Sequence, residues 1–263
     1  MKVAGSTYDE LVALRSKTVF ERAKLAAASG DRSRLDMTAA HVLSLLERFP
    51  ALYREAWVTP SNKASRFACD GFEISDGWAG LVDRLSARLS ADPSCHVWQL
   101  KEKFGRLAVY FDDDESVPRD PRLDAEMETA LDEAADESMR TCEICGEPGT
   151  RDKRGYLVGV RCGPCEQLDE ISATCKSIAD RLEGLDLASF AASEFAQDAI
   201  RMELLCLGHA AAGQPPASRA RLPGIGWERL EQFKEAKAIK GIPVEELWRF
   251  AIEEAPELGR KLR

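Results

Sequence analysis

The stretches Thr141-Cys142-Glu143-Ile144-Cys145-Gly146 and Arg161-Cys162-Gly163-Pro164-Cys165 carry most of the structural information in this chain of 263 residues. Each contains a Cys-x-x-Cys pair, and the two intervening residues let both sulfur atoms of a pair point at one ion. Gly146 and Gly163 allow the backbone to turn its amide groups toward the sulfur atoms. The pattern therefore predicts one structural zinc site, with Cys142, Cys145, Cys162 and Cys165 as its ligands.

The sixteen residues between the pairs include Arg154-Gly155 and then the strand-like run 156–160. Two cysteine turns joined in this way are typical of a zinc ribbon. Two disulfides, an iron–sulfur cluster or a redox pair would use the same cysteines. No apolar signal segment opens the sequence, and Met1–Gly5 leads into a polar helix. We therefore expect a reducing, cytoplasmic setting, which disfavours the disulfides.

Four thiolates would complete a tetrahedral coordination sphere, whereas a catalytic zinc keeps one position open for water. We therefore expect no catalysis at the metal. The sequence also lacks a phosphate-binding Gly-x-x-x-x-Gly-Lys-Ser/Thr motif and a Gly-x-Ser-x-Gly nucleophile elbow. The three histidines, His41, His96 and His209, lie in apolar-patterned segments, where a lone histidine is more often a core residue. No catalytic residue is assigned from the sequence.

The negative charge of the chain is concentrated in one segment. Residues 112–138 contain twelve Asp and Glu against two Arg, while the whole chain has a formal net charge of −9. We expect a polar loop over 112–118 and then a helix over 122–140 with a solvated acidic face. The alternatives are that the aspartates bind a hard cation or mimic nucleic-acid phosphate. The overall charge argues against a general nucleic-acid binder, and no stretch is apolar enough to cross a membrane.

The hydrophobic pattern predicts an α+β fold that is mostly helical, with a β-hairpin and the zinc ribbon. Helices are expected over 7–28, before Pro50 and after the candidate cap Asp76. The hairpin covers 95–111, with Gly105 at positive φ in its turn. After the second cysteine pair, apolar residues recur at alternating steps of three and four, which we call the seam. This spacing predicts a helix over 166–184 that packs on another helix or on a partner chain. The seam residues are Leu168, Ile171, Cys175, Ile178 and Leu182.

We divide the chain into N-terminal helices (1–50), an α+β zinc-ribbon domain (51–185), a connecting helix (186–212) and, after a Gly-Gln-Pro-Pro linker, a small C-terminal helical module (217–263). The module contains Leu222-Pro223-Gly224-Ile225-Gly226, which is similar to the turn of helix-hairpin-helix modules that bind nucleic-acid phosphate. The alternative is an ordinary turn into a helix, because 217–263 has ten basic and eight acidic residues. The candidate nucleic-acid contacts are Gly224, Gly226, Arg221, Arg229 and Lys234.

Three motifs together carry a resemblance to a known family: Asp76-Gly77-Trp78, Lys101-Glu102-Lys103-Phe104-Gly105 and the cysteine turn 141–146 with the second pair. Over roughly residues 45–170, the chain resembles a family of uncharacterised bacterial and prophage-encoded zinc-ribbon proteins. The resemblance implies a cysteine-bound metal and a bacterial or phage setting, and it implies no activity.

Three functions remain open. The first is a zinc-stabilised adaptor or regulatory protein that binds another protein, or itself through helix 166–184. The second is a nucleic-acid-binding regulator that uses the ribbon and the Leu222–Gly226 turn. The third is an enzyme whose site the sequence does not reveal. We favour the first, because the closed metal site, the acidic face and the helical seam all point to structure and contact rather than to chemistry.

Overall fold

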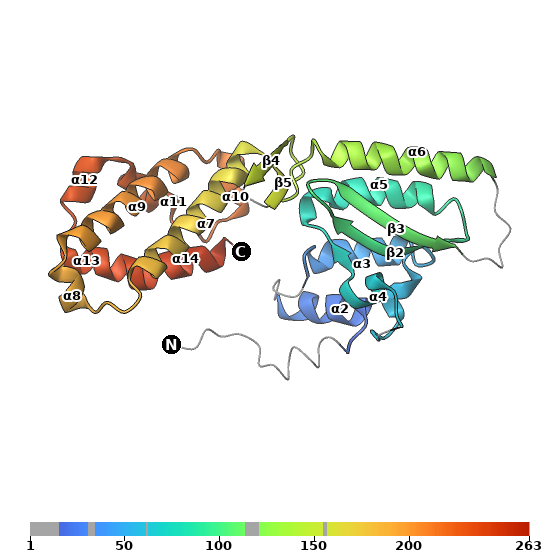
Figure 1. The fold of residues 1–263 in the computed structure, drawn as a ribbon, viewed down its shortest axis with the longest axis horizontal. Helices are drawn as coiled ribbons and strands as arrows, with labels where there is room; N and C mark the ends of the chain where they lie inside the picture. Colours follow the sequence, from blue (N-terminus) through green and yellow to red (C-terminus); the bar gives the residue numbers. More distant parts are fainter. Residues whose placement is uncertain (1–15, 31–34, 62, 114–120, 155–156, 263) are drawn as a thin grey trace. The chain divides into compact units, whose positions relative to one another are not determined.

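The computed structural model describes residues 16–30, 35–61, 63–113, 121–154 and 157–262. Its internal contacts separate the chain into two compact units, one ending at Cys162 and one beginning at Gly163 (Figure 1). The boundary differs from the sequence-based division, because the helices before Pro50 share the core of the first unit and the helix after Cys162 shares the core of the second.

The first unit combines helices with two small sheets. Its helical elements are α2 (Val19–Ser29), α3 (Ala39–Arg48), η1 (Arg54–Trp57), α4 (Arg66–Asp70), η2 (Asp76–Trp78), α5 (Ala79–Leu89) and α6 (Pro121–Ser138). Its strands are β1 (Phe72–Glu73), β2 (Cys95–Glu102), β3 (Leu107–Asp113), β4 (Thr150–Arg154) and β5 (Leu157–Arg161). The expected hairpin over 95–111 is therefore present as β2 and β3.

The larger sheet has the order β1-β2-β3, with β1 parallel and β3 antiparallel to β2. Leu100 pairs with Val109 and Lys101 with Ala108, and the register shifts between Val97 and Gln99. Figure 1 shows α5 and α6 side by side along this hairpin. Strands β4 and β5 form a separate antiparallel pair, in which Thr150 pairs with Arg161.

The first described helix begins later than the sequence pattern indicates. Thr18 caps α2 through a capping box, in which its side chain accepts from the Glu21 amide and the Glu21 carboxylate accepts from the Thr18 amide. A residue with extended backbone at the cap ends any helix that precedes it. The prediction of one continuous helix over 7–28 is therefore wrong, because the backbone is extended at Thr18. The part of that prediction before Ser16 lies outside the described residues.

The hairpin turn between β2 and β3 has an unusual backbone. Lys103 and Arg106 exchange backbone hydrogen bonds of 2.8 and 3.2 Å, which leaves a two-residue turn. Gly105 has a φ of 74°, as predicted, but Phe104 also has a positive φ of 56°. Two positive φ angles are typical of a type I′ turn, whose twist matches that of the strands. Phe104 adopts this conformation although its side chain is 62% exposed.

The acidic helix α6 is joined to α5 by ion pairs. Arg84 lies 2.5 Å from Glu137, and Arg88 pairs with Glu133. Met127, Ala130 and Ala134 are buried in the first core. The predicted solvated acidic face is thus partly paired with arginines of the neighbouring helix. Residues 114–120 of the acidic loop lie outside the described part of the chain.

The second unit is all helical in its described residues. Its elements are α7 (Gly163–Arg181), α8 (Leu187–Ala191), α9 (Glu194–Ala212), α10 (Pro216–Arg221), α11 (Trp227–Glu231), η3 (Gln232–Lys234), α12 (Ala236–Lys240), α13 (Val244–Arg249), η4 (Phe250–Glu254) and α14 (Ala255–Lys261). Helix α7 packs against α9 and α14.

The helical seam that begins at Leu168 is used inside this unit. Ile171, Cys175 and Ile178 are buried in a core with residues of α9 and α14, such as Leu204 and Leu258. A seam covered by its own chain is not free to pair with another chain. The structure therefore shows that this seam packs on helices of its own unit, and self-association through the helix over 166–184 would have to use another face of it.

The fold class is α+β and mostly helical, as the sequence predicts. Among the described residues, no helix combines the length and the apolar character needed to span a bilayer.

Candidate metal centre

The four predicted cysteines come together at one point. One sulfur atom from each of Cys142, Cys145, Cys162 and Cys165 lies within 4.8 Å of every other. Cys142, Cys162 and Cys165 are buried, and Cys145 is partly exposed. All eight cysteines of the chain lie in the described part, and none forms a disulfide.

The first cysteine turn is built by backbone hydrogen bonds. The Cys142 amide donates to the Glu147 carbonyl at 2.8 Å, and the Gly146 amide donates to the Cys142 carbonyl at 2.9 Å. Gly146 has a φ of 78°, a conformation that side chains with a Cβ rarely adopt. The Cys-x-x-Cys-Gly order thus folds locally into a loop that presents two sulfur atoms on one side.

Glu143, inside this turn, joins it to the end of β5. Its buried carboxylate accepts a hydrogen bond from the Val160 amide and one from the Arg161 guanidinium, both at 2.8 Å. Its own amide donates to the Val160 carbonyl at 3.0 Å. Because Val160 and Arg161 directly precede Cys162, these contacts set the first turn against the start of the second pair. A carboxylate paired and hydrogen-bonded in this way is costly to remove.

The Asp76-Gly77-Trp78 triplet contacts the other side of the first turn. The Gly77 amide donates to the Glu143 carbonyl at 2.8 Å, and the indole N–H of Trp78 donates to the Thr141 carbonyl at 2.8 Å. The Trp78 side chain is fully buried in the first core. A tryptophan therefore anchors the turn to the core, and this gives the cysteine cluster a fixed place in the first unit.

The backbones approach so closely here that only glycine fits. A Cβ on Gly77 would lie 2.1 Å from the carbonyl oxygen of Cys142, and one on Gly146 would lie 3.0 Å from the carbonyl oxygen of Gly77. Backbone atoms cannot move aside as a flexible side chain can. Gly77, Trp78 and Glu143 are functional positions that our sequence reasoning did not assign, although all three lie within the motifs that carry the family resemblance.

The second pair leads into a helix. Cys165 lies in the first turn of α7, whose unsatisfied amide groups and dipole favour negative charge such as a thiolate. An Nη2 atom of Arg221 lies 4.0 Å from the Cys165 sulfur and 3.2 Å from the Ser218 hydroxyl. A guanidinium beside a thiolate partly offsets the charge that four thiolates bring to one ion. Arg221, predicted as a nucleic-acid contact, is thus placed beside a cysteine of the cluster.

The donor set fits a tetrahedral ion. With metal–sulfur bonds of about 2.3 Å, a tetrahedron requires sulfur atoms roughly 3.8 Å apart. The Cys145 and Cys162 sulfurs are 3.5 Å apart, and all four lie within 4.8 Å of one another. The cluster can therefore hold one metal ion with only small adjustments. Four protein ligands would leave no position for a reacting water.

The remaining candidate nucleic-acid residues surround a turn in the second unit. Arg229 pairs with Glu254 at 2.9 Å, and the ammonium group of Lys261 donates to the Gly224 carbonyl at 3.1 Å. Gly226 precedes α11, which has only five residues, and Lys234 ends η3. Arg229 would have to leave its carboxylate to reach a phosphate. Nucleic-acid contact at this turn stays a prediction.

The histidines do not form a common site. His41 is exposed and its ring lies 2.9 Å from the Asp76 carboxylate, while His96 is buried near Arg54. His209 lies in the last turn of α9 and is exposed. The expectation of core histidines therefore holds for His96 alone.

Comparison of the chain with models of known protein families, with curated proteins and with solved structures found no match.

Proposed function

We propose that this chain is a protein-interaction protein, adaptor or regulatory, that is stabilised by structural zinc and has no catalysis at the metal. The observation that carries the proposal is the cluster of four cysteine sulfurs, each within 4.8 Å of the others. Such a donor set closes the coordination sphere, so the ion contributes folding free energy rather than a reactive water. The resemblance described above supports a bacterial or phage origin, which we include in the proposal.

Zinc suits the cluster better than the alternatives. Two Cys-x-x-Cys pairs joined by the β4–β5 hairpin match the ligand order of zinc ribbons, whose thiolates prefer tetrahedral Zn2+. A redox pair needs one exposed, reactive thiolate, whereas three of the four cysteines are buried and Cys145 is only partly exposed. Zinc would add a direct link between the two cysteine turns.

The contact role is supported by aromatic side chains on the β2–β3 hairpin. Trp98 and Tyr110 are each 40% exposed and Phe104 is 62% exposed. Aromatic residues are enriched at the centres of protein interfaces, because they bury a large area at a small cost in conformational entropy. Three of them on one hairpin favour a surface that another protein covers.

Metal analysis tests the first half of the proposal. We expect one zinc per chain in the purified protein and none in a Cys162→Ser variant. The matched control is Cys206→Ser, which removes an exposed cysteine that lies outside the cluster. Zinc at full stoichiometry in Cys162→Ser, or iron in the wild type, would overturn the assignment.

Native mass spectrometry of the protein purified from its own host tests the second half. We expect one defined protein partner, which a Trp98→Ser, Tyr110→Ser double variant loses while it keeps its zinc. Loss of the partner together with the zinc would show misfolding instead, and a Cys206→Ser sample controls for handling. A chain that carries nucleic acid, or that turns over a substrate without any partner, would contradict the interaction role.

A further inference from the structure

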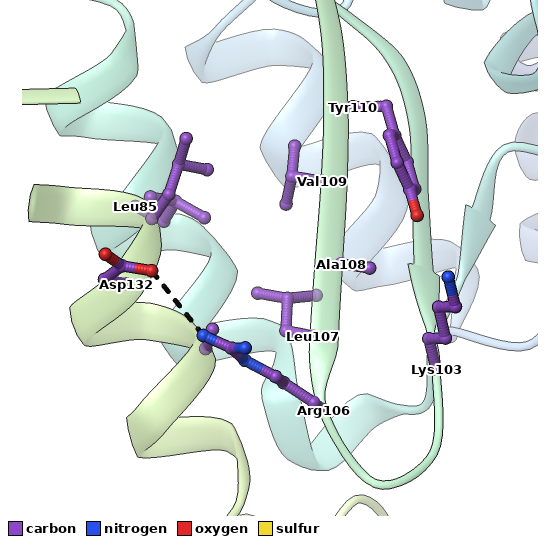
Figure 2. A pocket seen from close by; sticks show the side chains of 10 residues that line it. Leu85, Lys103, Arg106, Leu107, Ala108, Val109, Tyr110 and Asp132 are labelled. Carbon is purple, nitrogen blue, oxygen red and sulfur yellow. Dashed lines mark ion pairs between the residues drawn. The ribbon is translucent and has the colours of Figure 1, made fainter. Parts of the chain in front are cut away.

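Strand β3 is the outer strand of the larger sheet, and one side of it faces a groove. The sheet order β1-β2-β3 gives β3 only one partner strand within the described residues. A groove of about 290 Å³ follows this strand between the hairpin and α6 (Figure 2). Its lining includes Leu85, Leu107, Val109, Leu131 and Ala135, which are apolar, and Lys103, Arg106, Tyr110 and Asp132 at its rim.

The lining shows that the groove follows the free edge of the strand. Figure 2 shows Leu107 and Val109 on the side of β3 toward Leu85, and Ala108 and Tyr110 on the other side. Successive residues of a strand point to opposite faces. Residues from both faces can line one groove only where the edge between the faces is uncovered.

The hydrogen-bond pattern identifies the backbone groups at this edge. Lys103 and Arg106 exchange two backbone hydrogen bonds, and such pairs alternate along an antiparallel ladder. The pairs Lys101–Ala108 and Gln99–Tyr110 are therefore the bonded ones, so Leu107 and Val109 direct their backbone groups away from β2.

The end of α6 closes only the first part of this edge. The Leu107 amide donates to the Ser138 hydroxyl at 2.8 Å, and that hydroxyl donates to the Ala135 carbonyl at 2.6 Å. No bond of this kind joins Val109 to another described element. Open backbone groups beside an apolar groove match the requirements of an added β-strand.

The charge of the groove wall selects between possible occupants. Helix α6 carries seven carboxylates and one arginine, and four further cations lie against it: Arg84, Arg88, Arg106 and Lys103. Seven carboxylates against five cations leave a net charge of −2, and the Asp132 side chain is 81% exposed. Arg106 lies 3.5 Å from Asp132 and 3.9 Å from Asp136, so one guanidinium serves two carboxylates. Antiparallel pairing of two β3 strands about a two-fold axis would place two acidic helices beside each other. Repulsion between them disfavours a second copy of this chain and favours a basic occupant.

We propose that the edge of β3 from Val109 onward, together with α6, binds an extended basic segment of a partner protein as an added β-strand. An apolar side chain of that segment fills the space between Leu85 and Leu131, and lysine or arginine side chains next to it reach Asp132 and Asp136. This inference rests on the proposed interaction function and names the surface and the chemistry of the partner.

A synthetic peptide tests the proposal on the full-length, zinc-loaded protein. The probe is fluorescein-labelled Lys-Val-Lys-Leu-Lys-Val-Lys, and its control is Glu-Val-Glu-Leu-Glu-Val-Glu. We expect fluorescence anisotropy to show saturable binding of the basic peptide alone. Two further peptides carry N-methyl groups on alternate residues, in the two possible registers. One register should abolish binding and the other should leave it within about threefold, because an added strand directs every second amide toward β3. Equal effects of the two registers would overturn strand addition.

Two matched variants test the charge of the groove wall. Asp132→Lys at the rim should weaken binding of the basic peptide at least tenfold. Glu126→Lys makes the same charge change at an exposed position of α6 outside the groove and should change binding less than twofold. Equal losses would show a general charge effect and overturn the site, as would dimerisation of the wild type that the peptide cannot displace.

The outcome separates this inference from the proposed function. If a native partner is retained through Trp98 and Tyr110 but Asp132→Lys leaves that complex unchanged, the interaction function holds and the groove is wrong. If no partner is found and no peptide binds, both fail.

Discussion

The backbone amide of Gly77 donates a 2.8 Å hydrogen bond to the carbonyl oxygen of Glu143, and this bond joins η2, which directly precedes α5, to the first cysteine turn. Glu143 in turn binds Val160 and Arg161 next to Cys162. The position of the four clustered cysteines therefore depends on a glycine that is remote from them in the sequence. The bond also explains why a Cβ at Gly77 has no room.

Gly77→Ala should disturb the metal centre without touching a cysteine. Its Cβ would lie 2.1 Å from the Cys142 carbonyl oxygen, so the turn must shift. We expect a loss of about 1–3 kcal/mol in the free energy of unfolding, as for other overpacked sites, and faster zinc release to a chelator. Urea denaturation and a chelator assay measure the two effects.

Gly80→Ala is the control for that variant. Gly80 lies in α5, and the nearest atom to a Cβ there is the end of the Arg84 side chain at 3.7 Å. Alanine in a helix should raise the free energy of unfolding by up to about 1 kcal/mol. Similar behaviour of the two variants would contradict the close approach at Gly77.

Asp76 should make stability depend on acid pH. Burial raises the pKa of this carboxyl, but hydrogen bonds from His41 and from the Thr38 amide outweigh burial and hold its pKa below the usual value. A lowered pKa in the folded state stabilises the protein above the ordinary pKa of aspartate, about 3.9, and this contribution is lost as the pH falls through the lowered pKa.

The Asp76→Asn variant checks this dependence. We expect it to be less stable than the wild type at pH 7 by about 1–3 kcal/mol, because a charged acceptor is lost. The difference should shrink as the pH falls below about 4. Protonation of the cysteines affects both proteins alike, so the difference isolates Asp76. A difference that is constant from pH 7 to pH 3 would refute the assignment.

Cys175 should be unreactive although it is not one of the four clustered cysteines. Burial raises the pKa of its thiol to about 11, and the side chain is 3% exposed. The thiolate is the reactive form, so iodoacetamide at pH 8 should modify exposed Cys206 while Cys175 stays unmodified. Peptide mass mapping reads both sites. In urea, both cysteines should react with iodoacetamide. Equal modification rates of Cys175 and Cys206 in the native protein would contradict the burial of Cys175.

Phe104→Asn should stabilise the hairpin. Phe104 has a φ of 56°, which asparagine adopts more readily, and Asn-Gly is the preferred pair for this turn. The side chain is largely exposed, so little burial is lost. We expect a gain of about 1 kcal/mol in the free energy of unfolding, measured by urea denaturation. Destabilisation would show that the exposed ring has a packing role.

The features that depend on local spacing could be predicted from the amino-acid sequence. The intervals between cysteines identified Cys142, Cys145, Cys162 and Cys165, because two intervening residues fix how a turn presents its sulfur atoms. The alternation of side chains along residues 95–111 predicted the hairpin of β2 and β3. The glycine in its turn predicted the positive φ angle at Gly105. Each of these follows from residues close together in the chain.

Which element covers each surface became visible only in the folded chain. The seam with Ile171 and Ile178 showed which face of α7 is apolar, and only the fold showed that α9 and α14 cover it. The sequence pattern predicted Arg221 as a nucleic-acid contact, whereas the structure shows its guanidinium beside Cys165. The contact between Gly77 and Glu143 and the open edge at Val109 were equally hidden. The periodicity of apolar residues shows which way a side chain points from its helix or strand. It does not show which residue the side chain contacts, because that residue often lies in a distant segment that only the packing of the whole unit brings near.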